Sequence, residues 1–276
     1  MMIRKSFIGT SLLTAGMLLV QCAHAQELYV FTEPASNMPA KSISAKITGK
    51  FVKNNLGDGT FQRYAPEVMF GVSSDWMIHL SPSFSNMYTS NLRWESMKVY
   101  AKYRFFTNDE VHRHFRMAAF GEASYSRNEP MFDELSLDGD QSGVQGGIIL
   151  TQLSRKLAVS STLSVLKSLQ EKSKINASGT PGGAFAYTVS AGYLVLPVNY
   201  TSFRQLNVNV YTELLGQRAL GERKYMVDLA PAIQFIFNSN AKVNIGYRFQ
   251  LGGNMHRMGE RGWMIAFERT FLGALR

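Results

Sequence analysis

Charged side chains that recur at every second position are the residues of this sequence best suited to chemistry. Lys98, Lys102 and Arg104 follow this period, and Lys46 and Lys50 share it in an earlier segment. Because successive residues of a β-strand point to opposite faces, each group lies on one face of its strand. No acidic residue shares the face of the first group within its own segment. We therefore hypothesise that these three cations form a ladder that favours anions.

The same alternation, applied along the chain, places eight basic and five acidic side chains on polar strand faces, together with His79. The basic excess would attract anions if these faces surround water, whereas faces without water need their charges to pair with one another. The side chains expected on the polar faces are Lys46, Lys50, Arg63, Glu67, His79, Lys98, Lys102, Arg104, Arg116, Glu122, Glu213, Asp228, Arg248 and Glu268.

His79 and Ser81 form the one pair that suggests catalysis. They share a strand face and lie about 6.6–7 Å apart along it, at ~3.3–3.5 Å per residue. The pair resembles the His-x-Ser motif of outer-membrane phospholipases, but Pro82 and Ser83 stand where that family has Asn-Gly. In that family the pair also faces lipid, whereas here it is expected on the polar face. We therefore expect no enzyme, and we keep a lipid-hydrolysing activity as a minor alternative.

Two short histidine motifs raise the question of a metal site. His112-Arg113-His114 offers two imidazoles, and Met255-His256-Arg257-Met258 offers donors that suit copper. Asp109 and Glu110 precede the first motif, which is typical of a solvated turn, and the arginines around the second oppose a cation. Stable sites need three or four donors. We expect no metal and no cofactor.

The elements that position these residues are twelve segments with a period of two, which predict twelve β-strands. Many reach ten residues, long enough to cross a membrane at a tilt, and aromatic residues recur near their ends. A soluble β-sandwich would have shorter strands and no such girdles. We predict an all-β fold, a single transmembrane antiparallel up-and-down β-barrel of about 12 strands. The segments cover residues 43–51, 63–72, 76–85, 97–105, 115–125, 145–151, 157–165, 185–195, 206–214, 225–237, 243–251 and 263–271.

The connections between these segments alternate in length. Residues 73–75, 154–156 and 238–240 are tight polar turns, whereas residues 127–139 and 169–183 are long joins. Outer-membrane barrels have short periplasmic turns and longer external loops, so we expect the two long joins to be exposed outside the cell. Three prolines within the segments remove ladder hydrogen bonds, and bulges or bends are expected there: Pro66, Pro82 and Pro231.

The N-terminus has the three-part order of a secretory signal peptide. Basic Arg4 and Lys5 precede an apolar stretch over residues 7–20, and Ala23-His24-Ala25 supplies small residues for cleavage. The predicted organisation is a signal peptide over 1–25, a short periplasmic or lumen-lying extension over 26–41, and the barrel over 42–276. The sole cysteine, Cys22, leaves with the leader, which excludes disulfides and thiolate chemistry from the mature chain.

The sequence has 29 Lys and Arg against 20 Asp and Glu, and its net charge of +9 falls to +7 when Arg4 and Lys5 are removed. A basic chain in the cytoplasm would suggest nucleic acid as a partner, but export excludes that partner. We expect the bacterial outer membrane as the location. The expected partners are its lipids, lipopolysaccharide phosphates, the barrel assembly machinery and a small solute.

Two stretches near the C-terminus resemble known barrel proteins. Residues 230–249 combine a Pro-containing strand, a tight Asn turn and a Gly-Tyr-Arg-Phe strand. They look like the closing hairpin of barrels in the phenol-degradation meta-pathway group. Alternating aromatics over 263–271 are similar to the terminal strand that the barrel assembly machinery recognises, although Gly273-Ala274-Leu275-Arg276 follow it. The resemblance implies an outer-membrane channel, and it assigns no substrate-binding residue.

The expected function is a narrow passive channel for small polar or anionic solutes. The main alternative is a plugged structural or adhesive barrel that acts through its external loops, because twelve strands lie between filled small barrels and open porins. Fold class by itself does not decide between these functions.

Overall fold

The computed structural model describes residues 29–53, 59–170, 181–199, 202 and 204–275. The predicted signal peptide and most of the join over 169–183 lie outside the described residues. The described chain forms twelve antiparallel strands: β1(Ser42–Lys53), β2(Thr60–Gly71), β3(Trp76–Ser85), β4(Arg93–Glu110), β5(Arg113–Ser126), β6(Gly143–Ser154), β7(Leu157–Ser168), β8(Gly183–Leu196), β9(Asn207–Ala219), β10(Tyr225–Phe237), β11(Ala241–Gly253) and β12(Arg261–Phe271).

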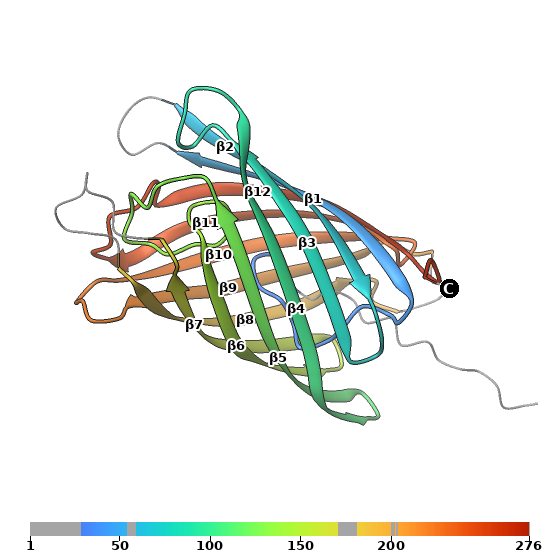
Figure 1. The fold of residues 1–276 in the computed structure, drawn as a ribbon. Coiled ribbons are helices and arrows are strands. Elements are labelled where there is room, and N and C mark those ends of the chain that lie inside the picture. The colour runs from blue at the N-terminus through green and yellow to red at the C-terminus, as the bar shows by residue number, and fades with distance from the viewer. Residues whose placement is uncertain (1–28, 54–58, 171–180, 200–201, 203, 276) are drawn as a thin grey trace, which may run out of the picture.

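These strands close into one barrel, which confirms the predicted fold class. Each strand pairs with its neighbour in sequence, and β1 pairs with β12 from Ile43 opposite Phe271 to Val52 opposite Gly262. Closure leaves no strand with an unpaired edge, so backbone polar groups along the strands are satisfied within the sheet. We call the end where β1 begins and β12 ends the base, and the opposite end the mouth (Figure 1).

The two faces of the barrel wall differ in chemistry because the side chains alternate. The inner face carries buried polar side chains, among them Ser44, Thr151, Ser160, Asn209, Gln234 and Asn244. Apolar side chains on the outer face are exposed, and they include Ile47, Val99, Leu163, Val189, Ile265 and Phe267. Exposed aromatics near the strand ends include Trp76, Tyr125, Tyr225, Trp263 and Phe271. This is the surface that a lipid-facing barrel presents.

Within the described residues, no helix is long and apolar enough to cross a membrane.

The tight turns lie at the base, as their composition predicts. Arg155, Asn238 and Ser239 have positive φ angles of 52°, 50° and 56°. Hairpin turns need such angles to follow the right-handed twist of the flanking strands, and Asn adopts them more readily than most residues.

The three prolines interrupt ladders but do not themselves mark bulges. The register of β2 and β3 places Pro66 opposite Pro82, and the ladder lacks pairs there. Pro231 keeps its partner on β9 but has none on β11. The register shifts in these strands lie one to two residues after Pro82, at Ser83/Phe84, and upstream of Pro231, at Val227/Asp228. Two more, at Arg104/Phe106 and Leu194/Leu196, are far from these prolines in sequence. A missing N–H therefore breaks a hydrogen bond without forcing an extra residue into the strand.

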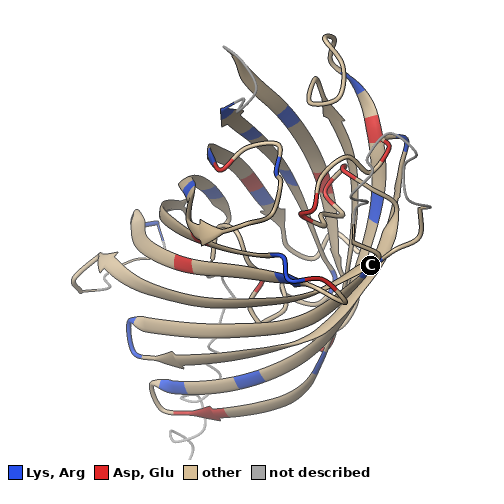
Figure 2. Cartoon of the chain, turned by 90° about the vertical axis from the view of Figure 1, so that its left-hand side faces the viewer, with Lys and Arg blue, Asp and Glu red and all other residues tan. Residues whose placement is uncertain are grey.

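Two segments from opposite ends of the barrel lie inside it. Residues 29–41, the N-terminal segment, precede β1 at the base, and residues 127–142, which we call the inward loop, join β5 to β6 at the mouth. Tyr29 and Val30 pack against Tyr211 and Met264 of the wall. Figure 2, viewed from the mouth, shows chain segments with charged residues of both signs within the ring of strands.

The prediction that residues 127–139 form an exposed external loop is wrong for most of the range, in which only Arg127, Glu129 and Met131 are exposed. Asn128, Leu135 and Leu137 are 2%, 3% and 3% exposed. The two leucines pack against Leu166 and Ala184 of the inner wall. Burying these apolar side chains and pairing the loop acids with wall cations favours the inward course over a solvated one.

Candidate functional site: a charged passage through the lumen

All fourteen charged or histidine side chains predicted on the polar face are buried or half-buried, and none is exposed. Their strand neighbours with the opposite parity carry the exposed apolar surface. The alternation therefore directs these fourteen side chains toward the interior of the barrel. The alternation does not predict which of these side chains form ion pairs with one another. Several of the pairs depend on acids of the inward loop.

Asp138 of the inward loop lies between two wall lysines. Its carboxylate accepts hydrogen bonds from the Nζ atoms of Lys50 on β1 and Lys98 on β4, each at 2.5 Å. Glu122 on β5 is a second acid near Lys98, at 3.7 Å. The ammonium groups of Lys50 and Lys98 hold the pKa of Asp138 well below its usual range, and this outweighs the opposing effect of burial. Asp138 is thus an ionised bridge across the lumen at neutral pH.

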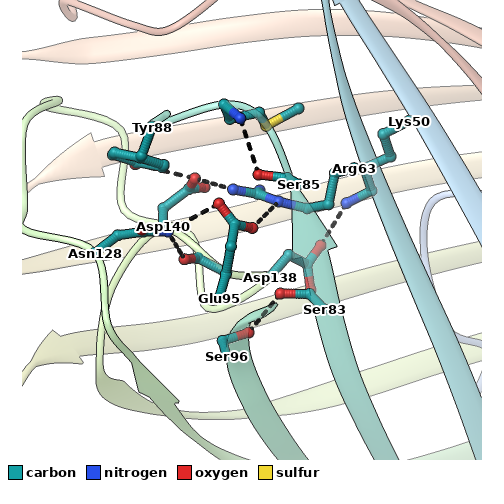
Figure 3. A network of polar contacts seen from close by, with 12 residues as sticks. Lys50, Arg63, Ser83, Ser85, Tyr88, Glu95, Ser96, Asn128, Asp138 and Asp140 are labelled. Atoms are coloured by element: carbon teal, nitrogen blue, oxygen red, sulfur yellow. Dashed lines mark hydrogen bonds and ion pairs between the residues drawn. The ribbon is translucent and has the colours of Figure 1, made fainter. Parts of the chain in front are cut away.

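A second cluster lies beside it and is centred on Arg63 of β2 (Figure 3). The Arg63 guanidinium binds Glu95 at 3.0 Å and Asp140 of the inward loop at 2.6 Å. Asn128, where the loop begins, donates to Glu95 at 2.9 Å. Arg63 and Glu95 are nearly inaccessible, so this pairing replaces the water that both charges lose.

Glu95 was not among the predicted site residues, and the reason is local. The register between β3 and β4 shifts at Ser83/Phe84, because Ser83 pairs with Ser96 but Phe84 pairs with Trp94. Glu95 is therefore the extra residue of a bulge, and both Glu95 and Ser96 are buried. A strict period of two places adjacent residues on opposite faces and fails at such a position.

A third cluster lies on the mouth side of the lumen. Arg257, in the β11–β12 connection, binds Asp228 with two nitrogens at 2.8 and 2.7 Å and Glu134 of the inward loop at 2.7 Å. Arg248 on β11 binds the same two acids, at 2.5 and 2.8 Å. Gln250 accepts a further hydrogen bond from Arg257 at 2.9 Å. Sequence reasoning placed Asp228 and Arg248 on this face but missed Arg257 and Glu134, which come from connections.

Glu134 should keep the inward loop docked over a wide pH range. Burial alone would raise its pKa, but Arg248 and Arg257 outweigh that effect and lower the pKa to about 2. Since the folded-state pKa lies below the unfolded one, the stabilisation is complete above about pH 4.5 and is lost as the pH falls toward 2. We expect pore conductance in planar bilayers to stay constant from pH 7 to pH 4 and to change as pH 2 is approached. Glu134→Gln should show the low-pH conductance already at pH 7; an identical acid response in this variant would contradict the assignment.

The predicted cation ladder on β4 is wrong as a set of free charges. Lys98 binds Asp138, Lys102 binds Glu33 of the N-terminal segment at 3.1 Å, and Arg104 binds Asp75 at 3.2 Å. These acids come from a loop, the N-terminal segment and a turn, so the sequence of the strand itself does not reveal them. Arg116 likewise binds Asp109, at 3.2 Å.

The remaining predicted residues lie on the inner wall outside the three clusters. Glu67 accepts from Nδ1 of His79 at 3.2 Å when that nitrogen is protonated. Lys46 pairs across β1 with Glu67 on β2 and with Glu268 on β12 in the strand register. Glu268 also binds Lys242, at 3.3 Å. Glu213 holds the N-terminal segment, as described below.

Three cavities follow one another along the inner wall. The outer one has a volume of about 120 Å³, the central one about 290 Å³ and the inner one about 40 Å³. The outer and central cavities share Phe31, Lys50, Arg63 and Met264 in their linings, and the central and inner ones share Glu33. The outer and central cavities therefore adjoin, whereas the central and inner cavities have only the Glu33 side chain in common. The three cavities lie along β11, β12 and β1 to β5, in space that the two inserted segments leave free.

The alternative chemistries find little support in the geometry. The Ser81 hydroxyl donates to the carbonyl of Pro66 at 3.1 Å, while His79 faces Glu67, so the two do not form a nucleophile–base pair in this arrangement. His114 binds Asp109, and His256 packs on the ring of Phe132. No group of three or more His, Cys, Asp or Glu suited to a metal occurs among the described residues.

Comparisons with known proteins support the fold. No known protein family and no curated protein matches the sequence. The solved structure of the KdgM porin is similar with a TM-score of 0.50 at 8% identity, covering 83% of this chain and 99% of that one. The NanC porin is similar with a TM-score of 0.55 at 10% identity, covering 82% and 98%. At such identities the likeness shows a shared barrel fold. The resemblance of residues 230–249 to the phenol-degradation group stays a prediction.

Proposed function

We propose that this protein is a narrow passive channel for small polar or anionic solutes in the outer membrane of a Gram-negative bacterium. The observation that carries this proposal is the series of three polar cavities along the inner wall, from the mouth side to the base side. A barrel whose lumen were only a structural core would close such a path with paired side chains. The two similar solved structures are described as porins, which is consistent with this function.

The lining of the path favours polar solutes. Four basic side chains line the central cavity, and so do four acids: Lys46, Lys50, Arg63 and Lys98 face Glu33, Glu67, Glu122 and Asp138. Charges of both signs facing a water-sized space suit solutes that exchange hydration for hydrogen bonds at each step. The acids offset the cations, so the lining supports polar solutes more strongly than a preference for anions.

Conductance in planar bilayers tests the proposal. We expect the refolded protein to form small, ohmic, voltage-independent channels, because the inner cavity of about 40 Å³ limits the passage even though the central one reaches about 290 Å³. The matched control is the same preparation after boiling, which should migrate more slowly in SDS gels and form no channels, since a closed barrel resists SDS until it is heated. Heat-shifted, folded protein without channel activity would overturn the proposal.

The proposed orientation has the base in the periplasm and the mouth outside the cell. Leu92 in the β3–β4 connection and Val111 in the β4–β5 turn are 59% and 87% exposed, at opposite ends of the barrel. We expect an impermeant maleimide to label Leu92→Cys but not Val111→Cys on intact cells, and to label both after lysis. The reverse pattern would invert the orientation.

Several further expectations belong to the same proposal. Residues 1–25 would be removed on export, the barrel assembly machinery would insert the chain, and lipopolysaccharide would surround the mouth. A plugged barrel remains the second candidate. The observation in its favour is that two chain segments occupy the lumen.

A further inference from the structure

The N-terminal segment occupies the lumen without being part of its wall. Tyr29, Ala35 and Asn37 are 2%, 0% and 3% exposed. The segment meets the barrel at the base, where the backbone N–H of Lys41 donates to Gly71 at 2.7 Å. Within the described part of the chain, no residue from 29 to 41 belongs to a strand. The barrel is therefore closed by the β1–β12 ladder alone, and the segment is not needed for closure.

A buried carboxylate of the wall binds the first part of the segment, residues 30–32. Glu213 on β9 is fully buried, and its Oε1 accepts from the backbone N–H groups of Val30 and Phe31, each at 2.9 Å. Its Oε2 accepts from the hydroxyl of Thr32 at 2.7 Å and from that of Ser190 at 3.3 Å. Two of these bonds go to backbone N–H groups, so Glu213 recognises the course of the chain there as well as the Thr32 side chain.

A buried ammonium group of the wall binds the second part of the segment, residues 34–36, through its backbone carbonyls. Lys102 on β4 is fully buried, and its Nζ donates to the backbone carbonyls of Pro34 at 2.7 Å and Ser36 at 2.9 Å. The backbone N–H of Ala35 donates to Thr151 on β6 at 2.8 Å. An acid thus binds N–H groups and a base binds carbonyls. Without the segment, both charges would face the lumen without these partners, so the wall is built to hold this peptide.

We propose that Tyr29–Asn37 is a resident plug, and that the lumen widens when the plug leaves its site on Glu213 and Lys102. Apart from its continuation into β1, the contacts of the described segment with the barrel are hydrogen bonds, ion pairs and apolar packing. Its release breaks no ladder of the barrel. The proposal rests on the proposed channel function for its conductance measurement. It goes beyond that function because it requires residues 29–37 to leave the lumen.

Two variants test the plug in planar bilayers, with folding checked by the heat-induced gel shift. Deleting residues 29–37 should raise the single-channel conductance roughly two- to five-fold, because the water-filled cross-section of the lumen becomes larger. The pair Thr32→Cys/Ser190→Cys should lock the plug, since the two hydroxyl oxygens lie 2.9 Å apart. Oxidation should remove every opening above the resting conductance, and reduction should restore such openings. Ser190→Cys alone is the matched control, and oxidation should not change its openings.

The outcomes separate this proposal from the channel function. A folded deletion variant with the parent's conductance, or oxidised and reduced pairs with the same openings, would overturn the plug and leave the channel standing. A silent parent with a conducting deletion variant would support the plug and overturn a channel that is open at rest. If the deletion prevents folding, Glu213→Ala should raise the frequency of large openings; no rise would overturn the proposal.

Discussion

Asp138→Asn should shift the ion selectivity of the pore toward anions. The substitution keeps the size of the side chain but removes the carboxylate that binds Lys50 and leaves Lys98 with Glu122 alone, at 3.7 Å. One unit charge about 6 Å from a passing ion is worth about 0.7 kcal/mol even at the dielectric constant of water, which is roughly three-fold in relative permeability. We therefore expect the chloride-to-potassium permeability ratio to rise at least about three-fold, measured as the reversal potential in a salt gradient.

Asp140→Asn is the matched control for this prediction. Asp140 lies two residues further along the inward loop and binds Arg63, but Arg63 keeps Glu95 as a second acid. The wall cation therefore stays neutralised, and the selectivity should change less than in Asp138→Asn. An unchanged reversal potential in Asp138→Asn would mean that ions do not pass Lys50 and Lys98, and the central cavity would not be the path.

Arg257→Ala should be the most destabilising single substitution in the charged clusters. The Arg257 side chain is 2% exposed, and its removal leaves Asp228, which is fully buried, and Glu134 with Arg248 as their remaining cation. Breaking a buried ion pair by removing one partner costs about 3 kcal/mol or more, and here two acids that are largely shielded from water would have to share Arg248. The free energy of unfolding should fall by about that amount, measured from the denaturant midpoint of the refolded barrel by tryptophan fluorescence.

Two further variants show whether geometry or charge is lost. Arg257→Lys keeps the charge but cannot bind Asp228 with two parallel N–H groups, so its unfolding free energy should lie between that of the parent and Arg257→Ala. Arg261→Ala removes an exposed arginine from the start of β12 and should change the stability by no more than about 0.5 kcal/mol. Equal midpoints for Arg257→Ala and Arg261→Ala would show that the third cluster contributes no net stability.

The alternation of polar and apolar residues predicted both the barrel and its inner face. Each of the twelve predicted segments coincides with an observed strand, and all fourteen predicted polar-face residues are directed inward. This success has a local cause, since the direction of a side chain follows from its position within its own strand. The order of the strands followed as well, because short connections join neighbouring antiparallel strands.

Only the tertiary structure decided how these charges are paired. Asp138 and Glu134 belong to a connection whose composition suits an exposed loop, and its inward course depends on lysines and arginines from distant strands. The alternation did not predict that Glu95 faces inward, because a bulge is set by the register with the neighbouring strand and not by the residue itself. The place of Tyr29–Asn37 depends on Glu213 and Lys102, which lie 66 to 183 residues along the chain from the groups that they bind. A periodic pattern reports which face a residue occupies, whereas its partner across the lumen is fixed only when the barrel closes.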